Sequence, residues 1–349
     1  HVARVRVTPV DTPEVSTWST LTINQGTAPA TEALEMPLQL TAYSHENKQF
    51  GYMPDYPLFG QVYFSPDNEP YMRTYTGITT WRDGEWVETA IADAVTSRPE
   101  SFEGEAVRLV STKIAFDRDG DVYLPASCAG KNALLHSQDG GLTFAAYEVP
   151  GDRGGLDIEQ FSGQNAPEGP PPFTRFRRTA KDTKLKWRSL NDLELFAPRK
   201  VDGRIEIGEP VLITRMCIGL SAHSGIPSSV VSDGAKVHVT WGEATDPDEK
   251  VPGVPAYVVT FDRETGELGT PALIGYGPPA NDVHNSPSIT MDGDGYLHAL
   301  IGTHGRPFQY CGSEAPNDAG GGWSEPLTAG VGLNMTYIGL VCGEDGTLH

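Results

Sequence analysis

The fold of this chain is decided by twelve residues, which read Ser288-Ile-Thr-Met-Asp292-Gly-Asp-Gly-Tyr-Leu-His298-Ala. Two short runs with apolar and β-branched residues flank a turn made of Asp and Gly. Such a turn supplies the positive φ angles that a tight hairpin needs, and the runs are too short for helices. The stretch therefore predicts an antiparallel β-hairpin.

The same pattern recurs along the chain, whereas helical periodicity is nearly absent. The residues that follow five such turns are Tyr71, Tyr123, His238, His298 and His349, at spacings of 52, 115, 60 and 51 residues. The spacing of 115 is about twice the others. A period of 51 to 60 residues, with two legible strands and room for another pair, is typical of a four-stranded propeller blade.

The double spacing predicts a degenerate blade near residues 175–213, with strands at Leu193–Ala197 and Arg204–Gly208. The fold class expected is therefore all-β, a β-propeller with six legible inner hairpins, forming a single domain over residues 1–349. The last hairpin ends in mid-blade. Either the N-terminal strand Val2–Thr8 completes that blade and closes the ring, or the chain is a fragment that is incomplete at its C-terminus.

The composition is strongly acidic, with 46 Asp and Glu against 26 Lys and Arg, a formal net charge of −20. This balance argues against nucleic acid and anionic membrane surfaces as partners, because their phosphates would be repelled. No apolar run is long enough to cross a bilayer. We expect a monomer that is secreted or periplasmic, although the chain itself begins without a signal peptide.

The chain has four widely spaced cysteines and no CxxC pair, which excludes a zinc ribbon and a disulfide-dense fold. Lone buried thiols are the simpler interpretation, and one or two disulfides are the alternative. The segments Asp117–Asp121 and Asp292–Gly295 resemble fragments of a calcium loop but lack its terminal Glu, so we interpret them as hairpin turns. We expect no cofactor for the chemistry, and a structural Ca or Zn ion has no further support.

The segment Ser137-Gln-Asp139-Gly-Gly-Leu-Thr143-Phe144 fits the Asp-box pattern of propeller blades. We expect it to be a folded turn outside the active site. The basic run Arg175–Arg188 is the cationic patch of an acidic chain. It is interpreted as a solvated strand face, and a groove for an anionic glycan is the alternative.

The candidate catalytic residues flank the hairpin with which we began. His284 precedes its first strand and His304 follows its second, and these two ends lie side by side in an antiparallel pair. Asn285 and Arg306 are their neighbours in the chain. We therefore expect two imidazoles to meet at one face, with Asn285 and Arg306 contacting a substrate beside them.

The preceding blade offers His223 as a further substrate contact, but it lacks the histidine pair. Aligning Pro227 with Pro287 places Ser224 opposite His284 and Ala244 opposite His304. The pair is therefore not a structural requirement of the blade. Paired histidines can act as base and charge stabiliser, and removal of a proton beside a carboxylate needs a cation for the developing charge.

The segment 225–349, with His284-Asn-Ser-Pro-Ser-Ile, Asp292-Gly-Asp-Gly-Tyr-Leu-His and Gly302-Thr-His304-Gly, resembles the propeller-fold polysaccharide lyases, chiefly the ulvan lyases, within the BNR or Asp-box repeat family. The resemblance implies a seven-bladed propeller and β-elimination on a uronic acid within an acidic, ulvan-like polysaccharide. It also implies that the two catalytic histidines correspond to His284 and His304.

In that family a tyrosine and an arginine from other blades complete the site. The resemblance implies Tyr337 as the tyrosine that carries the proton, and Arg306 or Arg73 as the cation that neutralises the carboxylate. Two other functions stay open. One is a sialidase-like glycoside hydrolase with an arginine triad, for which Arg73, Arg177 and Arg215 are the candidates. The other is a non-catalytic glycan- or protein-binding propeller.

Overall fold

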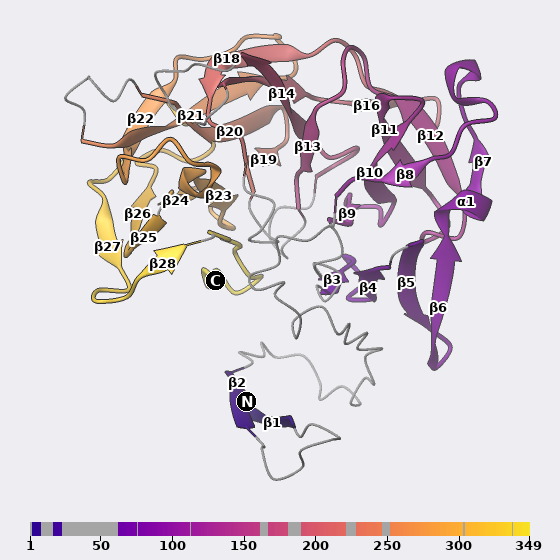
Figure 1. Cartoon of the computed structure of the whole chain (residues 1–349), viewed down its shortest axis with the longest axis horizontal. Coiled ribbons are helices and arrows are strands. Elements are labelled where there is room, and N and C mark those ends of the chain that lie inside the picture. Colours follow the sequence, from indigo (N-terminus) through magenta and orange to yellow (C-terminus); the bar gives the residue numbers. More distant parts are fainter. Residues whose placement is uncertain are drawn as a thin grey trace. The chain divides into compact units, whose positions relative to one another are not determined.

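The computed structural model describes most of the chain beyond residue 61 (Figure 1). The described ranges are 2–7, 17–22, 62–74, 76–111, 113–160, 167–180, 190–220, 228–245, 252–302, 304–336 and 338–349, with the backbone alone for 2–7, 17–22, 180 and 304. The chain divides into two compact units, 1–38 and 39–349, where we expected a single domain.

In the first unit, β1 (Val2–Val7) pairs antiparallel with β2 (Thr17–Thr22) along its whole length. The strand that we considered for closing the last blade therefore has a hairpin partner on one edge. All the blades described below belong to the second unit.

The second unit is a β-propeller of antiparallel sheets, as its repeat predicts, and five blades are seen among the described residues. Four are four-stranded: β3–β6 form the first blade, β13, β14, β15 and β18 the third, β19–β22 the fourth, and β23, β24, β26 and β27 the fifth. Their bounds are, in order, Val62–Phe64, Pro70–Arg73, Gly77–Arg82, Glu85–Ala90, Gly155–Ile158, Phe173–Ala180, Leu190–Phe196, Val211–Cys217, Val230–Asp233, Lys236–Gly242, Val254–Asp262, Ala272–Gly277, Ser288–Met291, Leu297–Ile301, Phe308–Gly312 and Leu327–Ala329.

The second blade is wider. Its strands are β8 (Arg108–Leu109), β9 (Ala115–Phe116), β10 (Val122–Cys128), β11 (Lys131–Ser137) and β12 (Phe144–Glu148), and β7 (Val95–Ser97) adds a parallel edge to β12. Helix α1 (Ile91–Ala94) and the turn η4 (Glu100–Phe102) lie between β6 and β8 in the chain. Two small pairs stand outside the blades, β16 (Arg199–Val201) with β17 (Arg204–Glu206), and β25 (His304–Arg306) with β28 (Met335–Thr336).

The turns of the inner hairpins in the second and fifth blades are held by aspartate side chains. In the fifth blade, Oδ1 of Asp292 accepts hydrogen bonds from the backbone N–H groups of Asp294 (3.0 Å) and Tyr296 (2.9 Å). Asp117 does the same in the second blade. The two calcium-like fragments are therefore hairpin turns, and the described residues contain no cluster of three or more His, Cys, Asp or Glu side chains able to hold a metal ion.

The degenerate third blade is where we predicted it, but its inner hairpin is not. The hairpin consists of β13 and β14, because β14 pairs with β13 on one edge and with β15 on the other. The predicted strand at 193–197 lies in β15, the third strand of the blade. Arg204–Glu206 is outside the blade, in the small pair with β16. No Asp-Gly turn joins β13 to β14, so the sequence pattern could not reveal them.

The Asp box is a folded turn between β11 and β12, in agreement with the prediction. Oδ1 of Asp139 accepts from the N–H groups of Leu142 (3.0 Å) and Thr143 (2.9 Å), and its Oδ2 accepts from Oγ1 of Thr143 (2.6 Å). Burial alone would raise the pKa of Asp139, but the hydrogen bonds from Thr143, Ser137 and Leu142 outweigh it and hold the pKa below its usual value.

Apolar cores fill the spaces between neighbouring blades. Tyr71 and Ile78 of the first blade, for example, pack in one cluster with Phe116 and Phe144 of the second. Val231 of the fourth blade shares a cluster with Ile289 and Met291 of the fifth. All four cysteines are free and buried, which confirms the interpretation as lone thiols. None of the helices described has the length and apolar character needed to cross a bilayer.

Buried polar groups tie three blades together at Asp157 on β13. Its Oδ1 lies 2.6 Å from Nζ of Lys113, in the second blade, and both side chains are 3% exposed. Its Oδ2 accepts from the N–H (2.8 Å) and Oγ (2.6 Å) of Ser229, beside β19 of the fourth blade. Because both charges are removed from water, the Lys113 ammonium and the Asp157 carboxylate each stabilise the other in place of the lost hydration.

His238 on β20 ties the fourth blade to the fifth. Its Nε2 lies 2.8 Å from Oδ1 of Asn317, and its Nδ1 lies 3.0 Å from Oγ1 of Thr260. An amide oxygen only accepts, so Nε2 carries the proton and Nδ1 accepts from Thr260. Burial lowers the pKa of His238 to about 4, and the ring stays neutral at pH 7.

We predict that Asp157→Asn lowers the free energy of unfolding by about 3–5 kcal/mol, because it leaves the Lys113 ammonium buried without a counter-charge. The double variant Lys113→Met/Asp157→Asn should be more stable than Asp157→Asn alone. Urea unfolding of the parent, Asp157→Asn, Lys113→Met and the double variant measures the coupling free energy between the two side chains. Additive effects of the two substitutions would contradict the prediction.

The pH dependence of stability gives a second prediction. The folded pKa of His238 lies below the ordinary value of about 6.5, so the unfolded chain binds a proton that the folded chain does not. Stability should therefore fall as the pH falls from about 6.5 to about 4, by up to about 1.4 kcal/mol per pH unit from this group. His238→Gln should make the slope shallower in denaturant unfolding across this window, and an unchanged slope would refute the assignment.

Candidate functional site

The candidate site is built where the fourth blade passes into the fifth. Strand β22 ends at Gly277, and the turn η5 (Val283–Asn285) leads into β23. Strand β24 ends at Ile301, close to the same place, and β25 begins at His304. The two histidines of the sequence motif therefore belong to the two chain segments that leave this end of the blade.

Asp282 caps η5 and also faces the imidazole of His284. It has an extended backbone, and its Oδ1 accepts from the N–H of His284 at 3.1 Å. The same oxygen lies 2.7 Å from Nδ1 of the His284 ring. One carboxylate oxygen thus contacts both the backbone N–H and the imidazole of His284.

This contact has a chemical consequence. A carboxylate within hydrogen-bond distance of Nδ1 favours the tautomer with its proton on Nδ1, so Nε2 carries the lone pair. The side chain of His284 is 13% exposed and that of Asp282 is 8% exposed. The pair is thus largely shielded from water, and both ring nitrogens of His284 are buried.

A close backbone approach holds η5 against the end of β24. A Cβ built on Gly302 would lie 1.8 Å from the carbonyl oxygen of Asn285, so no larger residue fits at this position. Nδ2 of Asn285 donates to the carbonyl oxygens of Pro278 (3.1 Å) and Ala280 (2.6 Å). The end of β22, the turn η5 and the end of β24 are thereby joined at Asn285.

The meeting of the two imidazoles stays a prediction. His304 lies on β25, where its backbone pairs with Thr336, and its side chain is outside the described part of the structure. Tyr337 and His223 also lie outside the described residues. Positions 284 and 304 each lie within two residues of the contact between Asn285 and Gly302, which agrees with the expected proximity of the two chain ends.

Two residues that we predicted to contact a substrate, Asn285 and Arg73, are buried and bind backbone carbonyl oxygens instead. Asn285 is 1% exposed, and its amide binds backbone carbonyls. Arg73 on β4 is 8% exposed, and its guanidinium donates to carbonyl oxygens of Thr74, Gly77 and Ser111. Burial lowers the pKa of Arg73 to about 10. Both side chains are occupied in holding their own segments of backbone, which gives no support to a direct role in binding.

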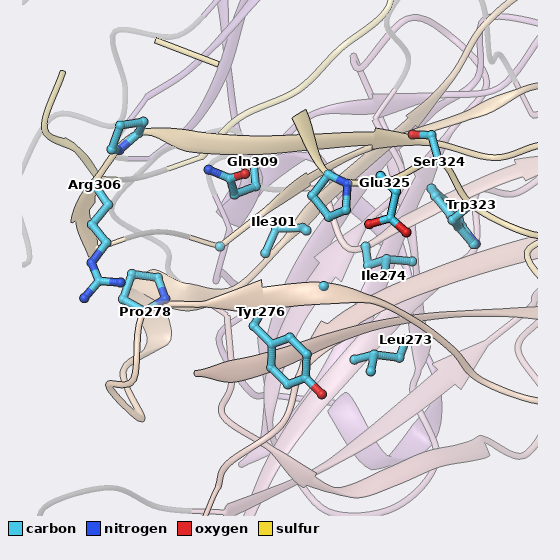
Figure 2. A pocket seen from close by; sticks show the side chains of 14 residues that line it. Leu273, Ile274, Tyr276, Pro278, Ile301, Arg306, Gln309, Trp323, Ser324 and Glu325 are labelled. Atoms are coloured by element: carbon cyan, nitrogen blue, oxygen red, sulfur yellow. The ribbon is translucent and has the colours of Figure 1, made fainter. Parts of the chain in front are cut away.

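Arg306 is exposed and lies at one end of a cavity of about 570 Å³ between the fourth and fifth blades (Figure 2). Strand β22 forms one wall, and β26 with the segment before β27 forms the other. Figure 2 shows Arg306 and Pro278 at one end and Trp323 and Ser324 at the other. The side chains between them are apolar, aromatic or amide-bearing except for the carboxylate of Glu325, and they include Leu273, Ile274, Tyr276, Ile301, Gln309 and Pro326.

The sequence patterns missed Asp282 and the cavity. Asp282 has a readable signal, since an Asp two residues before a His at a strand entry can cap a turn and face the ring. The cavity has none, because its walls come from separate blades. Trp323 packs against the cluster around Ile289, which holds residues of both the fourth and the fifth blade.

The arginines expected of a sialidase-like site are engaged elsewhere among the described residues. Arg177 and Arg215 share one carboxylate, since Oδ2 of Asp192 lies 2.9 Å from Arg177 and 3.5 Å from Arg215. Arg175 is buried and binds Glu194 at 2.7 Å. The cationic run thus carries its own counter-charges over residues 175–177, and residues 181–189 lie outside the described part.

Comparison with known proteins supports the propeller. Residues 257–349 match the family described as BNR repeat-containing family member. That segment holds His284, His304 and all the cavity residues. No curated protein matches the chain.

Several solved propeller proteins are similar in structure. TolB from Acinetobacter baumannii is 11% identical, with a TM-score of 0.37 over 79% of this chain and 55% of TolB. The Trypanosoma rangeli sialidase, solved with sialic acid, is 14% identical, with a TM-score of 0.32 over 70% of this chain and 39% of the enzyme. A xyloglucanase from Xanthomonas campestris is 18% identical, with a TM-score of 0.30 over 77% and 45%. The chain spans just over half of TolB and less than half of the two enzymes.

The close approach at Asn285 yields a prediction. Gly302→Ala should lower the free energy of unfolding by about 1–3 kcal/mol, because the added methyl must displace the carbonyl of Asn285. The matched control is Gly155→Ala on β13, where a Cβ would meet nothing within 4 Å. Denaturant unfolding compares the two variants. Equal stabilities would contradict the close approach.

Proposed function

We propose that this chain is a polysaccharide lyase that cleaves a uronic-acid-containing, ulvan-like polysaccharide by β-elimination. The observation that carries the proposal is the Asp282–His284 pair, with 2.7 Å between Oδ1 and Nδ1, at the entry to a blade of the BNR type. The carboxylate beside Nδ1 leaves the lone pair of the ring on Nε2, the form in which a histidine acts as a base. The resemblance of the same segment to the propeller-fold lyases supports the reaction class.

The reaction requires removal of the proton at C5 of the uronate, next to its carboxylate. In the proposed mechanism Nε2 of His284 takes this proton. The electron pair of the C5–H bond forms the C4–C5 double bond, and the bond from C4 to the glycosidic oxygen breaks. The leaving oxygen receives a proton from His304 or Tyr337, and the products are a new hydroxyl end and an unsaturated uronate.

Negative charge develops on the uronate carboxylate during this step, and a cation nearby lowers its energy. Arg306 is the candidate that the described surroundings favour. It is exposed on the segment that follows His304, whereas Arg73 is buried among carbonyl groups of the first and second blades. No cofactor is needed for this chemistry, because proton transfer and charge neutralisation both come from side chains.

We predict that His284→Ala and His304→Ala each reduce turnover by at least about 100-fold, which is the lower range of a general acid–base contribution. A panel of uronic-acid polysaccharides serves as substrate, and the ultraviolet absorbance of the unsaturated product is the readout. A hydrolase would produce reducing ends without this absorbance, and a binding protein would produce neither.

The matched control is His298→Gln in the same hairpin. His298 lies near the turn, where its ring contacts Asp292 (2.9 Å) and the hydroxyl of Tyr310 (2.7 Å). This variant should keep its activity once folded, as judged by circular dichroism. Full activity in both alanine variants would end the assignment.

A further inference from the structure

The outermost strand of the fourth blade, β22, has a strand partner on one edge only. On that edge Pro255 of β21 lies opposite Tyr276. A proline has no N–H to donate, and the carbonyl oxygen of Pro255 accepts from the N–H of Glu243, on the side of β20, at 3.0 Å. The pair is therefore not hydrogen-bonded, and the N–H and C=O of Tyr276 point away from β21, toward the outer edge of the blade.

This edge is open to a further strand. No group in the described part of the chain bonds to the backbone N–H or C=O of Tyr276. Strand β22 reads Ala272-Leu-Ile-Gly-Tyr-Gly277, so it lacks the charged residues and prolines that protect many edges. A bulge at Ile274 interrupts the ladder with β21 and leaves the end around Tyr276 as the part suited to new pairing.

The cavity between the fourth and fifth blades extends around the same edge. Tyr276 lies opposite Pro255 on one face of the sheet, and Gly275 lies opposite Ala256 on the other. Both Tyr276 and Gly275 line the cavity, so it touches both faces of β22 and the edge that joins them. The space of about 570 Å³ is therefore adjacent to the unpaired backbone groups of Tyr276.

The second blade shows that an outer edge of this propeller accepts an additional strand. Its strand β12 pairs with β11 on one edge and with β7 on the other, and β7 comes from the segment that connects the first blade to the second. Strand β22 has no such addition among the described residues. A strand that pairs with it has to come from outside the described part of the fourth blade.

The lining of the cavity sets the size and polarity of the segment that fits. Its wall from Leu273 to Pro278 spans roughly 16 Å, the length of about five extended residues. Ile274, Ile301 and Pro326 make the middle of the cavity apolar. A peptide offers one N–H and one C=O per residue at the spacing of a strand, which a saccharide does not, so the exposed backbone groups favour a peptide.

The charges of the cavity give the peptide a direction. Figure 2 shows Arg306 at the end near Pro278, and Glu325 toward the other end, near Trp323. Both charged side chains are exposed. A basic side chain is attracted by Glu325 and repelled by Arg306, and the net charge of −20 favours a cationic partner as a whole.

We propose that β22 and this cavity form a docking site for an extended peptide segment of another protein. The segment is about five residues long and apolar in its centre, with Lys or Arg at its C-terminal end. It pairs antiparallel with β22 through Tyr276, since antiparallel pairing is the more stable kind. In this direction its C-terminal end lies away from Arg306 and beside Glu325. The inference is independent of the lyase proposal, because it uses no contact of His284.

The charge preference is tested with two acetylated and amidated hexapeptides, Val-Thr-Val-Thr-Val-Lys and Val-Thr-Val-Thr-Val-Glu. Titration calorimetry with the full chain measures their binding. We expect the Lys peptide to bind at least tenfold more tightly. Glu325→Gln should reduce this preference to less than threefold, and the control Glu267→Gln, which makes the same charge change at another exposed position, should leave it unchanged.

The backbone pairing is tested with two substitutions at one position. Tyr276→Pro removes the N–H at the open edge without removing a hydrogen bond to β21, and Tyr276→Ala loses the same ring but keeps the N–H. The Lys peptide should bind the proline variant at least tenfold more weakly than the alanine variant. Circular dichroism shows whether both variants are folded.

Methylated peptides test the same bonds without a change in the protein. Methyl groups on alternate backbone nitrogens of the Lys peptide fall either on the N–H groups that face β22 or on those that face away. One methylated peptide should bind at least tenfold more weakly and the other less than threefold, a result that decides the matter even where Tyr276→Pro does not fold. Equal effects of the two methylations, equal binding of the Lys and Glu peptides, no binding of the Lys peptide, or its displacement by a uronic-acid hexasaccharide would each overturn the docking site.

Discussion

The carboxylate of Asp157 is the interaction on which the arrangement of the blades depends. One oxygen faces Lys113 of the second blade, and the other accepts from Ser229 at the start of the fourth, so a single buried group spans three consecutive blades. Apolar packing between blades is not directional, whereas hydrogen bonds to a buried charge have a required geometry. A polar contact of this second kind also joins the fourth blade to the fifth, where Nε2 of His238 lies 2.8 Å from Oδ1 of Asn317.

The candidate site uses the same principle on a smaller scale. Asn285 donates to two carbonyl oxygens, and Gly302 allows the backbone of β24 to approach it. The turn before the fifth blade is thus fixed from three sides. Asp282 then orients the ring of His284 within this fixed turn. A site of this kind is organised by the fold itself, before any ligand is bound.

Charge is distributed locally, and the net value of −20 does not describe it. Arg175 and Arg177 of the third blade are paired with Asp192 and Glu194, so this part of the basic run carries its own counter-charges. The cavity between the last two blades instead holds a cation and an acid at different places along its length. The local charge at each end of this cavity therefore differs in sign, although the protein as a whole is acidic.

The sequence by itself determined the repeat, the inner hairpins with Asp turns, the Asp box and the blade that carries His284. Each of these is a local signal, because a turn needs particular residues at particular offsets. The tertiary structure decided what local signals do not contain. The β13–β14 hairpin has no turn signature, the partners of Arg175 and Arg177 follow from strand pairing, and the cavity has walls from two blades. Asp282 lies between these cases, since its cap is local but its distance to the ring of His284 depends on how the turn is folded.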